Sequence, residues 1–110
     1  SEKIQKCKKA NIQDIIIDPG FGFGKTIEHN FKLLREMEAL KILKLPILAG
    51  LSRKGMIYKS LNTSANEALN GTSILNTLAL NNGASILRVH DVKEAREAVA
   101  LFQLYKNATL

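Results

Sequence analysis

Residues 14–25 read Asp-Ile-Ile-Ile-Asp-Pro-Gly-Phe-Gly-Phe-Gly-Lys, a short branched apolar run that passes at once into polar and glycine residues. Two further runs have the same form, Pro-Ile-Leu-Ala at 46–49 and Ser-Ile-Leu-Arg-Val at 85–89. Runs of this length without polar alternation predict strands buried on both faces, as in a parallel sheet. We therefore expect strands over about 14–18, 46–50 and 84–89.

The segments between these runs have the apolar spacing of helices. We expect helices over 28–44, over about 64–82 and from Asp91 onward, and residues 1–10 look like the end of another helix. Asn82-Gly83 is a suitable left-handed stop, and Asp91 is placed to cap the helix that it begins. Strands joined by helices are parallel, so the order predicts an α/β fold of successive strand–helix units.

The composition is that of one folded domain, with 110 residues, 45% hydrophobic and 24% charged. The formal net charge is +6, but most cations are spread along the chain and only 5% of residues are aromatic, which argues against a nucleic-acid interface. No run approaches the roughly 20 apolar residues of a membrane span. The single cysteine cannot form an internal disulfide. We expect a cytoplasmic protein that binds neither nucleic acid nor membrane.

Polar and conformationally special residues follow each predicted strand. In parallel α/β sheets and barrels, ligands bind at the carboxyl ends of the strands because loops and helix N-termini converge there. The candidate site residues are Asp18 with Phe23 in the glycine-rich loop, Gly50 with Ser52, Arg53, Lys54 and Gly55 after the second strand, and Arg88, Val89 and His90 after the third.

Each candidate also has a plainer interpretation. Asp18 can accept two hydrogen bonds from a guanidine-like heterocycle, or it can simply form a turn, as Asp-Pro-Gly often does. The Ser52-Arg53-Lys54 stretch can orient an anionic substrate or lie in an exposed turn. Arg88 and His90 lie two apart on a strand and so point the same way, which suits an anion site before a helix, although His90 could instead be bonded to its neighbour Asp91.

Other motifs fit less well. Gly24-Lys25-Thr26 matches the end of a phosphate-binding P-loop, but the glycine required five residues earlier is Pro19. His29 and His90 lie far apart, and no two histidines have the spacing of a transition-metal site. A stand-alone phosphate- or nucleotide-binding α/β module that uses Arg88 and His90 remains an alternative.

Together these motifs resemble the C-terminal part of the dihydropteroate synthase family of pterin-binding enzymes. The resemblance covers nearly the whole of residues 1–110 and rests on 18–25 with His29-Asn30, on 50–54, Gly71-Thr72, Gly83-Ala84 and 88–92. It implies the last three units of a (β/α)₈ TIM barrel. It also implies a transferase of folate biosynthesis, the target of sulfonamides, which condenses dihydropterin-methyl pyrophosphate with p-aminobenzoate and releases pyrophosphate. Mg²⁺ assists in the family, and its ligands are expected outside this segment.

The resemblance also implies roles for the candidate residues. Many family members carry Ser where this chain has Gly55, so a hydrogen bond near the aminobenzoate carboxylate is expected to be absent. The implied sets are Asp18, Phe23, Gly50, Lys54 and Arg88 for the pterin, Arg88, Val89 and His90 for pyrophosphate, and Phe23, Ser52, Arg53 and Gly55 for the p-aminobenzoate side.

The length of the chain predicts how much of such a barrel it contains. Eight strand–helix units of about 35 residues would require roughly 280 residues, near the usual size of this barrel, and three are present here. We expect residues 1–110 to be an excised C-terminal portion that covers strands six to eight and is inactive alone. Its two exposed parallel edges predict self-association into a homo-oligomer.

Overall fold

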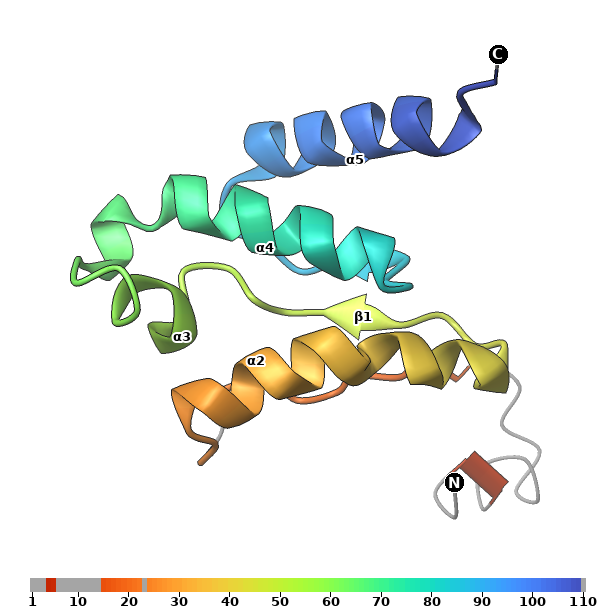
Figure 1. Ribbon diagram of the computed structural model, residues 1–110, viewed down its shortest axis with the longest axis horizontal. Coiled ribbons are helices and arrows are strands. Elements are labelled where there is room, and N and C mark those ends of the chain that lie inside the picture. The colour runs from red at the N-terminus through yellow and green to blue at the C-terminus, as the bar shows by residue number, and fades with distance from the viewer. Residues whose placement is uncertain (1–3, 6–14, 23, 110) are drawn as a thin grey trace.

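The computed structural model describes residues 4–5, 15–22 and 24–109, and helices alternate with short strands along the chain. The elements are α2 (Ile27–Glu36), the 3₁₀ helix η1 (Met37–Leu43), β1 (Leu48–Ala49), α3 (Gly55–Tyr58), the 3₁₀ helix η2 (Ala65–Glu67), α4 (Leu69–Asn81), β2 (Ile86–Leu87) and α5 (Val92–Asn107). Figure 1 shows β1 between α2 and α4, with α5 packed on the outer side of α4. The expected helix end at 1–10 lies outside the described residues apart from 4–5.

The strand segments pair in parallel and in chain order. β1 pairs with β2, with Leu48 opposite Ile86 and Ala49 opposite Leu87, and Ile17 forms a parallel bridge to Ile47 just before β1. The backbone N–H of Leu48 donates to the carbonyl of Ile17 at 2.8 Å. The predicted parallel order is therefore confirmed.

The predicted strand lengths are wrong. The expected strands over 46–50 and 84–89 contract to two residues each, and the expected strand over 14–18 contracts to the bridge at Ile17, with residue 14 outside the described part. Pro19 has no N–H to donate, and the Asp18 carboxylate accepts a hydrogen bond from the Gly20 N–H at 2.9 Å, which turns the chain away from the sheet. The first ladder therefore ends one residue before Asp18.

The predicted helices lie where the sequence places them, but parts of them have 3₁₀ rather than α-helical geometry. Thr26 Oγ1 accepts a hydrogen bond from the His29 N–H at 3.0 Å and caps α2. The predicted helix over 28–44 changes to 3₁₀ geometry at Met37 and ends at Lys44, whose φ is 53°. The predicted helix over 64–82 is η2 followed by α4, and it ends as expected because Gly83 adopts a φ of 108°. The short helix α3 was not predicted.

An apolar core fixes the strand segments between the helices. Burial of one large apolar side chain stabilises a fold by roughly 1.5–3 kcal/mol, more than an exposed ion pair usually contributes. Packing rather than surface charge therefore holds the strand ends in place. The most deeply buried apolar members are Phe21, Met37, Ile47, Ala49, Leu51, Ala68 and Ala79.

Helices α3 and α4 approach closely at a glycine. A Cβ atom at Gly71 would lie 2.5 Å from Ile57 Cγ2 and 3.2 Å from Leu61 Cδ1, so a side chain there would separate the two helices. Among the residues that the structure describes, none of the helices combines the length and the apolar character that a membrane span requires.

Candidate functional site

The residues that follow Ile17, β1 and β2 meet at one edge of the sheet. Arg88 Nη1 lies 3.5 Å from Asp18 Oδ2, which links the first strand end to the last. Lys54 Nζ donates to the carbonyl oxygen of Phe21 at 2.6 Å, which links the middle strand end to the glycine-rich loop. The carboxylate of Asp18, the ammonium of Lys54 and the guanidinium of Arg88 therefore share one rim, as the sequence predicts.

Asp18 forms the turn that the plainer interpretation predicts, and its second carboxylate oxygen remains directed at the rim. Its Oδ1 closes the turn to Gly20, while its Oδ2 faces Arg88. The Asp18 and Arg88 side chains are 43% and 57% exposed, and an ion pair this exposed stabilises a fold by only about 0–1 kcal/mol. The carboxylate can therefore exchange its contact with Arg88 for a ligand at little cost.

The glycine-rich loop is held by side chains from outside it. Gly20 and Gly22 have φ values of 80° and 103°, a region that a residue with a side chain rarely adopts. The Gly22 N–H donates to Asn30 Oδ1 at 2.9 Å, and Lys25 Nζ donates to the Gly20 carbonyl at 2.7 Å. Phe21 is buried in the core. Phe23 lies outside the described residues.

Lys54 is a half-buried cation at this rim. Its backbone is extended, and it immediately precedes α3. Burial of its ammonium, followed by the nearby positive charge of Arg88, lowers the pKa of Lys54, while the negative charge of Asp18 acts in the opposite direction. Lys54 is therefore a short-range hydrogen-bond donor that a carbonyl or anionic ligand can reach at the edge of the sheet.

Gly50 leaves space that Arg88 fills. A Cβ atom at Gly50 would collide with Nη2 of Arg88 and would lie 2.8 Å from its Cζ. The guanidinium therefore lies directly over the backbone of Gly50. A side chain at position 50 could be accommodated only if the Arg88 guanidinium moved aside.

Ser52 and Arg53 contact the next strand end rather than open solvent. Ser52 is buried, and its Oγ lies 2.7 Å from Nδ1 of His90. Arg53 Nε and Nη2 donate to the two carboxylate oxygens of Asp91 at 2.9 and 3.0 Å. The exposed-turn interpretation of this stretch and the direct bond between His90 and Asp91 are therefore both wrong.

Asp91 does not cap α5 with its side chain, contrary to the sequence prediction. It occupies the N-cap position, but no hydrogen bond joins its carboxylate to the first turn. The fork of Arg53 takes both carboxylate oxygens, and the hydrogen bonds from Arg53 lower the pKa of Asp91. The Arg53 pKa is raised by the same contact.

Two polar residues support the site without having been assigned a role from the sequence. Thr72 Oγ1 accepts the backbone N–H of Arg53 at 3.0 Å, and Asn30 holds Gly22 as described above. Both side chains are buried on helices. A polar residue on the core-facing side of a helix is the signal that could have indicated them, because a buried polar group needs a partner.

The described residues do not fit a magnesium site. Nowhere in 15–22 and 24–109 do three His, Cys, Asp or Glu side chains come together in a way that could hold a metal ion. A hard divalent cation takes most of its ligands from carboxylates and other oxygens. Asp18, whose carboxylate faces a guanidinium, does not supply such a set.

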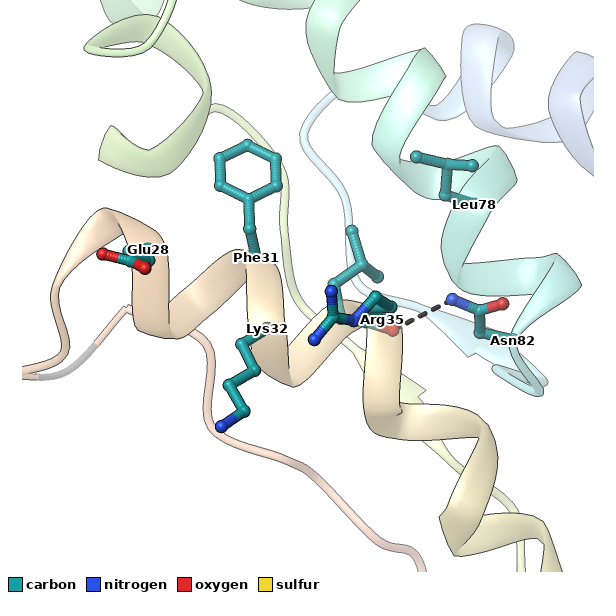
Figure 2. Close-up of a pocket in the computed structure, with 7 residues that line it drawn as sticks. Glu28, Phe31, Lys32, Arg35, Leu78 and Asn82 are labelled. Carbon is teal, nitrogen blue, oxygen red and sulfur yellow. Dashed lines mark hydrogen bonds between the residues drawn. The ribbon is translucent and has the colours of Figure 1, made fainter.

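A separate hollow lies between α2 and α4, away from the strand ends. It has a volume of about 480 Å³ and is lined by Glu28, Phe31, Lys32, Leu34, Arg35, Leu78 and Asn82. Figure 2 shows Asn82 reaching from α4 to α2, where its Nδ2 donates to the Leu34 carbonyl at 3.0 Å. None of the strand-end side chains lines this hollow, so the candidate site is the sheet edge.

Parallel strand–helix units with charged side chains at the carboxyl ends of the strands place this chain among the α/β proteins, a class that typically binds ligands at that edge. Comparison with known proteins then gives the family. The chain belongs to the pterin binding enzyme family, whose model matches residues 1–90.

Relatives and solved structures agree with this assignment. The chain is 42% identical to dihydropteroate synthase of Escherichia coli strain K12 over 104 residues, which cover 93% of this chain and 37% of that enzyme. It matches the Yersinia pestis dihydropteroate synthase in a sulfonamide drug complex with a TM-score of 0.93, 38% identity and coverage of 98% and 40% of the two chains. The Coxiella burnetii enzyme in complex with pteroic acid gives a TM-score of 0.91, 44% identity and coverage of 96% and 40%. The chain thus spans about two fifths of these proteins.

Replacement of Gly50 by alanine tests the close approach of Arg88. The added methyl group must displace the guanidinium, but an exposed side-chain tip can move, so the free energy of unfolding should change by less than about 1 kcal/mol. The Arg88 Nε–Hε signal in ¹H–¹⁵N spectra should shift markedly. Gly55→Ala is the matched control, because its Cβ would lie 3.5 Å from Cδ and Cε of Lys59, an ordinary contact, and it should leave that signal in place. An unmoved Arg88 signal in Gly50→Ala would contradict the geometry.

Replacement of Asp91 by asparagine tests its ion pair with Arg53. Because the pKa of Asp91 is lowered in the folded chain, the carboxylate stabilises the fold above its unfolded pKa of about 3.9, and this stability is lost as the pH falls through the folded pKa. Urea unfolding should show Asp91→Asn less stable than the parent at pH 7, with the difference fading below about pH 4.

The exposed α5 residue Glu97 provides the matched control for this pair. Glu97→Gln should leave the free energy of unfolding nearly unchanged at pH 7. A deficit in Asp91→Asn that is as large at pH 3 as at pH 7 would show that the carboxylate charge is not what stabilises the contact.

Proposed function

We propose that this chain supplies the pterin- and diphosphate-binding edge of a dihydropteroate synthase. The reaction is the folate-biosynthesis step in which dihydropterin-methyl pyrophosphate and p-aminobenzoate give dihydropteroate and pyrophosphate. The observation that carries the proposal is the meeting of Asp18, Lys54 and Arg88 at one sheet edge, in a chain 42% identical to the Escherichia coli enzyme. The Coxiella burnetii relative with pteroic acid bound supports the same ligand class.

On the pterin side, we assign complementary hydrogen-bonding roles to three groups. The Asp18 carboxylate accepts from the amino group and adjacent ring N–H of the heterocycle, and Lys54 donates to its carbonyl and ring nitrogen. Arg88 moves off Asp18 to cover the ring, and Gly50 leaves room beneath it. Phe23 completes this side of the proposed site.

On the leaving-group side, Arg88, Val89 and His90 receive the diphosphate. The bond between the pterin methyl carbon and the diphosphate oxygen breaks, and its electron pair leaves with the diphosphate. The amine nitrogen of p-aminobenzoate then attacks the resonance-stabilised carbon and loses a proton. Stabilisation of the departing negative charge by Arg88 and His90 lowers the barrier, while Asp18 offsets the developing positive charge on the pterin.

The p-aminobenzoate side is assigned to the segment that begins at Ser52 and Arg53 and reaches Gly55, together with Phe23. A sulfonamide bound to the Yersinia pestis relative supports a site for aromatic amines in this family, and we extend that inhibitor class to this chain. Because Gly55 has no hydroxyl group, the carboxylate of p-aminobenzoate is held here without a side-chain hydrogen bond from that position.

We assign residues 1–110 to the last three strand–helix units, strands six to eight, of a (β/α)₈ barrel. Apolar residues of α4, β2 and α5, including Leu80, Leu87, Val99 and Phe102, line an open groove of about 610 Å³ beside β2, which supports further barrel units or a second copy packing there. Mg²⁺ ligands would lie in those further units. We place the reaction in the cytoplasm.

A chimera tests the proposed function. In it, this chain replaces the matching 37% of the Escherichia coli enzyme, and dihydropteroate formation and diphosphate release are measured. We expect turnover, and we expect Lys54→Ala to lower kcat/KM by about a hundredfold because a preorganised donor is lost. Lys93→Ala, an exposed cation on α5 outside the site, should retain activity.

Two outcomes would contradict the proposal. The first is a folded chimera that makes no dihydropteroate although the parent Escherichia coli enzyme does. The second is calorimetry in which the 110-residue chain binds nucleotide but no pterin, which would favour a stand-alone nucleotide-binding module.

A further inference from the structure

Two dipeptides at neighbouring strand ends pair side chain to side chain. Ser52 is hydrogen-bonded to His90. The residues that follow them, Arg53 and Asp91, form an ion pair. These contacts join the loop after β1 to the start of α5. The two pairs, which we call the strand-end brace, lie beside Arg88 and Lys54, the residues assigned to diphosphate and pterin.

The hydrogen bonds of Ser52 favour one tautomer of the His90 ring. A serine hydroxyl has one proton and two lone pairs. The backbone N–H of His90 donates to Ser52 Oγ at 3.2 Å, which uses a lone pair and leaves the hydroxyl proton available. Ser52 is 7% exposed, so that proton needs a protein acceptor. Within the described part of the chain, only His90 Nδ1 is hydrogen-bonded to this oxygen besides that N–H.

The hydroxyl therefore donates to Nδ1, and the proton of the neutral imidazole lies on Nε2. That nitrogen is on the far edge of the ring from Ser52, and His90 is exposed. Held in this way, His90 presents its Nε2–H as a hydrogen-bond donor. Because Arg88 is also exposed and lies two residues earlier, both donors are available to the same anion.

The ion pair of Arg53 and Asp91 holds the loop after β1 against the start of α5. Arg53 has a φ of 54°, an uncommon conformation for a residue with a side chain. Its guanidinium makes four hydrogen bonds: Nη1 donates to the carbonyls of Ala65 at 2.6 Å and Asn66 at 3.0 Å, and Nε and Nη2 donate to Asp91. Arg53 thus acts on the site by holding the backbone between Ser52 and Lys54.

We propose that Ser52 is a positioning residue that fixes His90 as the Nε2–H tautomer, so that His90 donates to a diphosphate oxygen, and that the Arg53–Asp91 pair maintains this alignment. The proposal rests on the proposed function, because it names what Ser52 and Arg53 do for the diphosphate side of that site. It gives them an indirect role, through His90 and Lys54, in addition to their place in the segment assigned to the p-aminobenzoate side.

Two-bond ¹H–¹⁵N spectra of the histidine rings in the 110-residue chain test the proposal. The chain has two histidines, so His29→Gln identifies the His90 signals. We expect the Nε2–H pattern for His90 in the parent chain, and a shift of its Nε2 signal when inorganic diphosphate is added. Ser52→Ala should give a mixture of tautomers and weaken diphosphate binding about threefold to tenfold, as expected for one lost hydrogen bond.

Two further variants separate the tautomer from packing. Ser60→Ala removes a hydroxyl that donates to the Met56 carbonyl outside the site, and it should alter neither readout. Ser52→Thr keeps a hydroxyl and should restore the Nε2–H pattern.

An Nδ1–H pattern in the parent chain would overturn the proposal whether or not any variant folds. So would an Nε2 signal that diphosphate leaves unmoved, or a Ser52→Ala chain with unchanged tautomer and diphosphate affinity. These readouts do not require turnover, so an inactive chimera with the expected His90 pattern would overturn the proposed function and leave this inference intact.

Discussion

The parallel pairing of the Ile17 segment with β1, and of β1 with β2, is the constraint on which the site depends. Because the three segments run in the same direction, their carboxyl ends meet at one edge and bring together residues separated by up to 70 positions, as Asp18 and Arg88 are. The ladders are short, so the apolar core rather than the number of ladder hydrogen bonds keeps them aligned. Phe21 and Leu51, buried beside the rim, connect that core directly to the site.

The two ion pairs at the rim differ in geometry and exposure, so they are suited to different roles. The Asp18–Arg88 pair is long, single and largely exposed, so a ligand can replace either partner at little cost. The Arg53–Asp91 pair uses both carboxylate oxygens, and its side chains are each 22% exposed, so it is suited to holding loops together. The rim thus combines an exposed ion pair that a ligand could replace with a less exposed one that supports the backbone around Lys54.

The sequence predicted the strand order and the strand-end cluster because both follow from local patterns, an apolar run and the polar residues after it. It extended the first strand through Asp18, although Pro19 lacks the N–H that would continue the ladder, and apolar character did not mark where β1 and β2 begin and end. It missed α3, which at four residues is too short to show a helical period. It assigned Asp91 to a local cap, since the competing partner Arg53 lies 38 positions away and only the fold brings them together. Ser52 and His90 are also 38 positions apart, so the sequence did not indicate that they pair.

The most direct test of a shared site is a double-mutant cycle for pterin binding, measured calorimetrically in the chimera with Asp18→Asn, Lys54→Ala and the double variant. If both side chains hold one ligand, each single substitution weakens pterin binding and the double variant loses less than the sum of the two, with a coupling of at least about 0.5 kcal/mol. Strictly additive losses, or pterin affinity that neither substitution alters, would contradict the account.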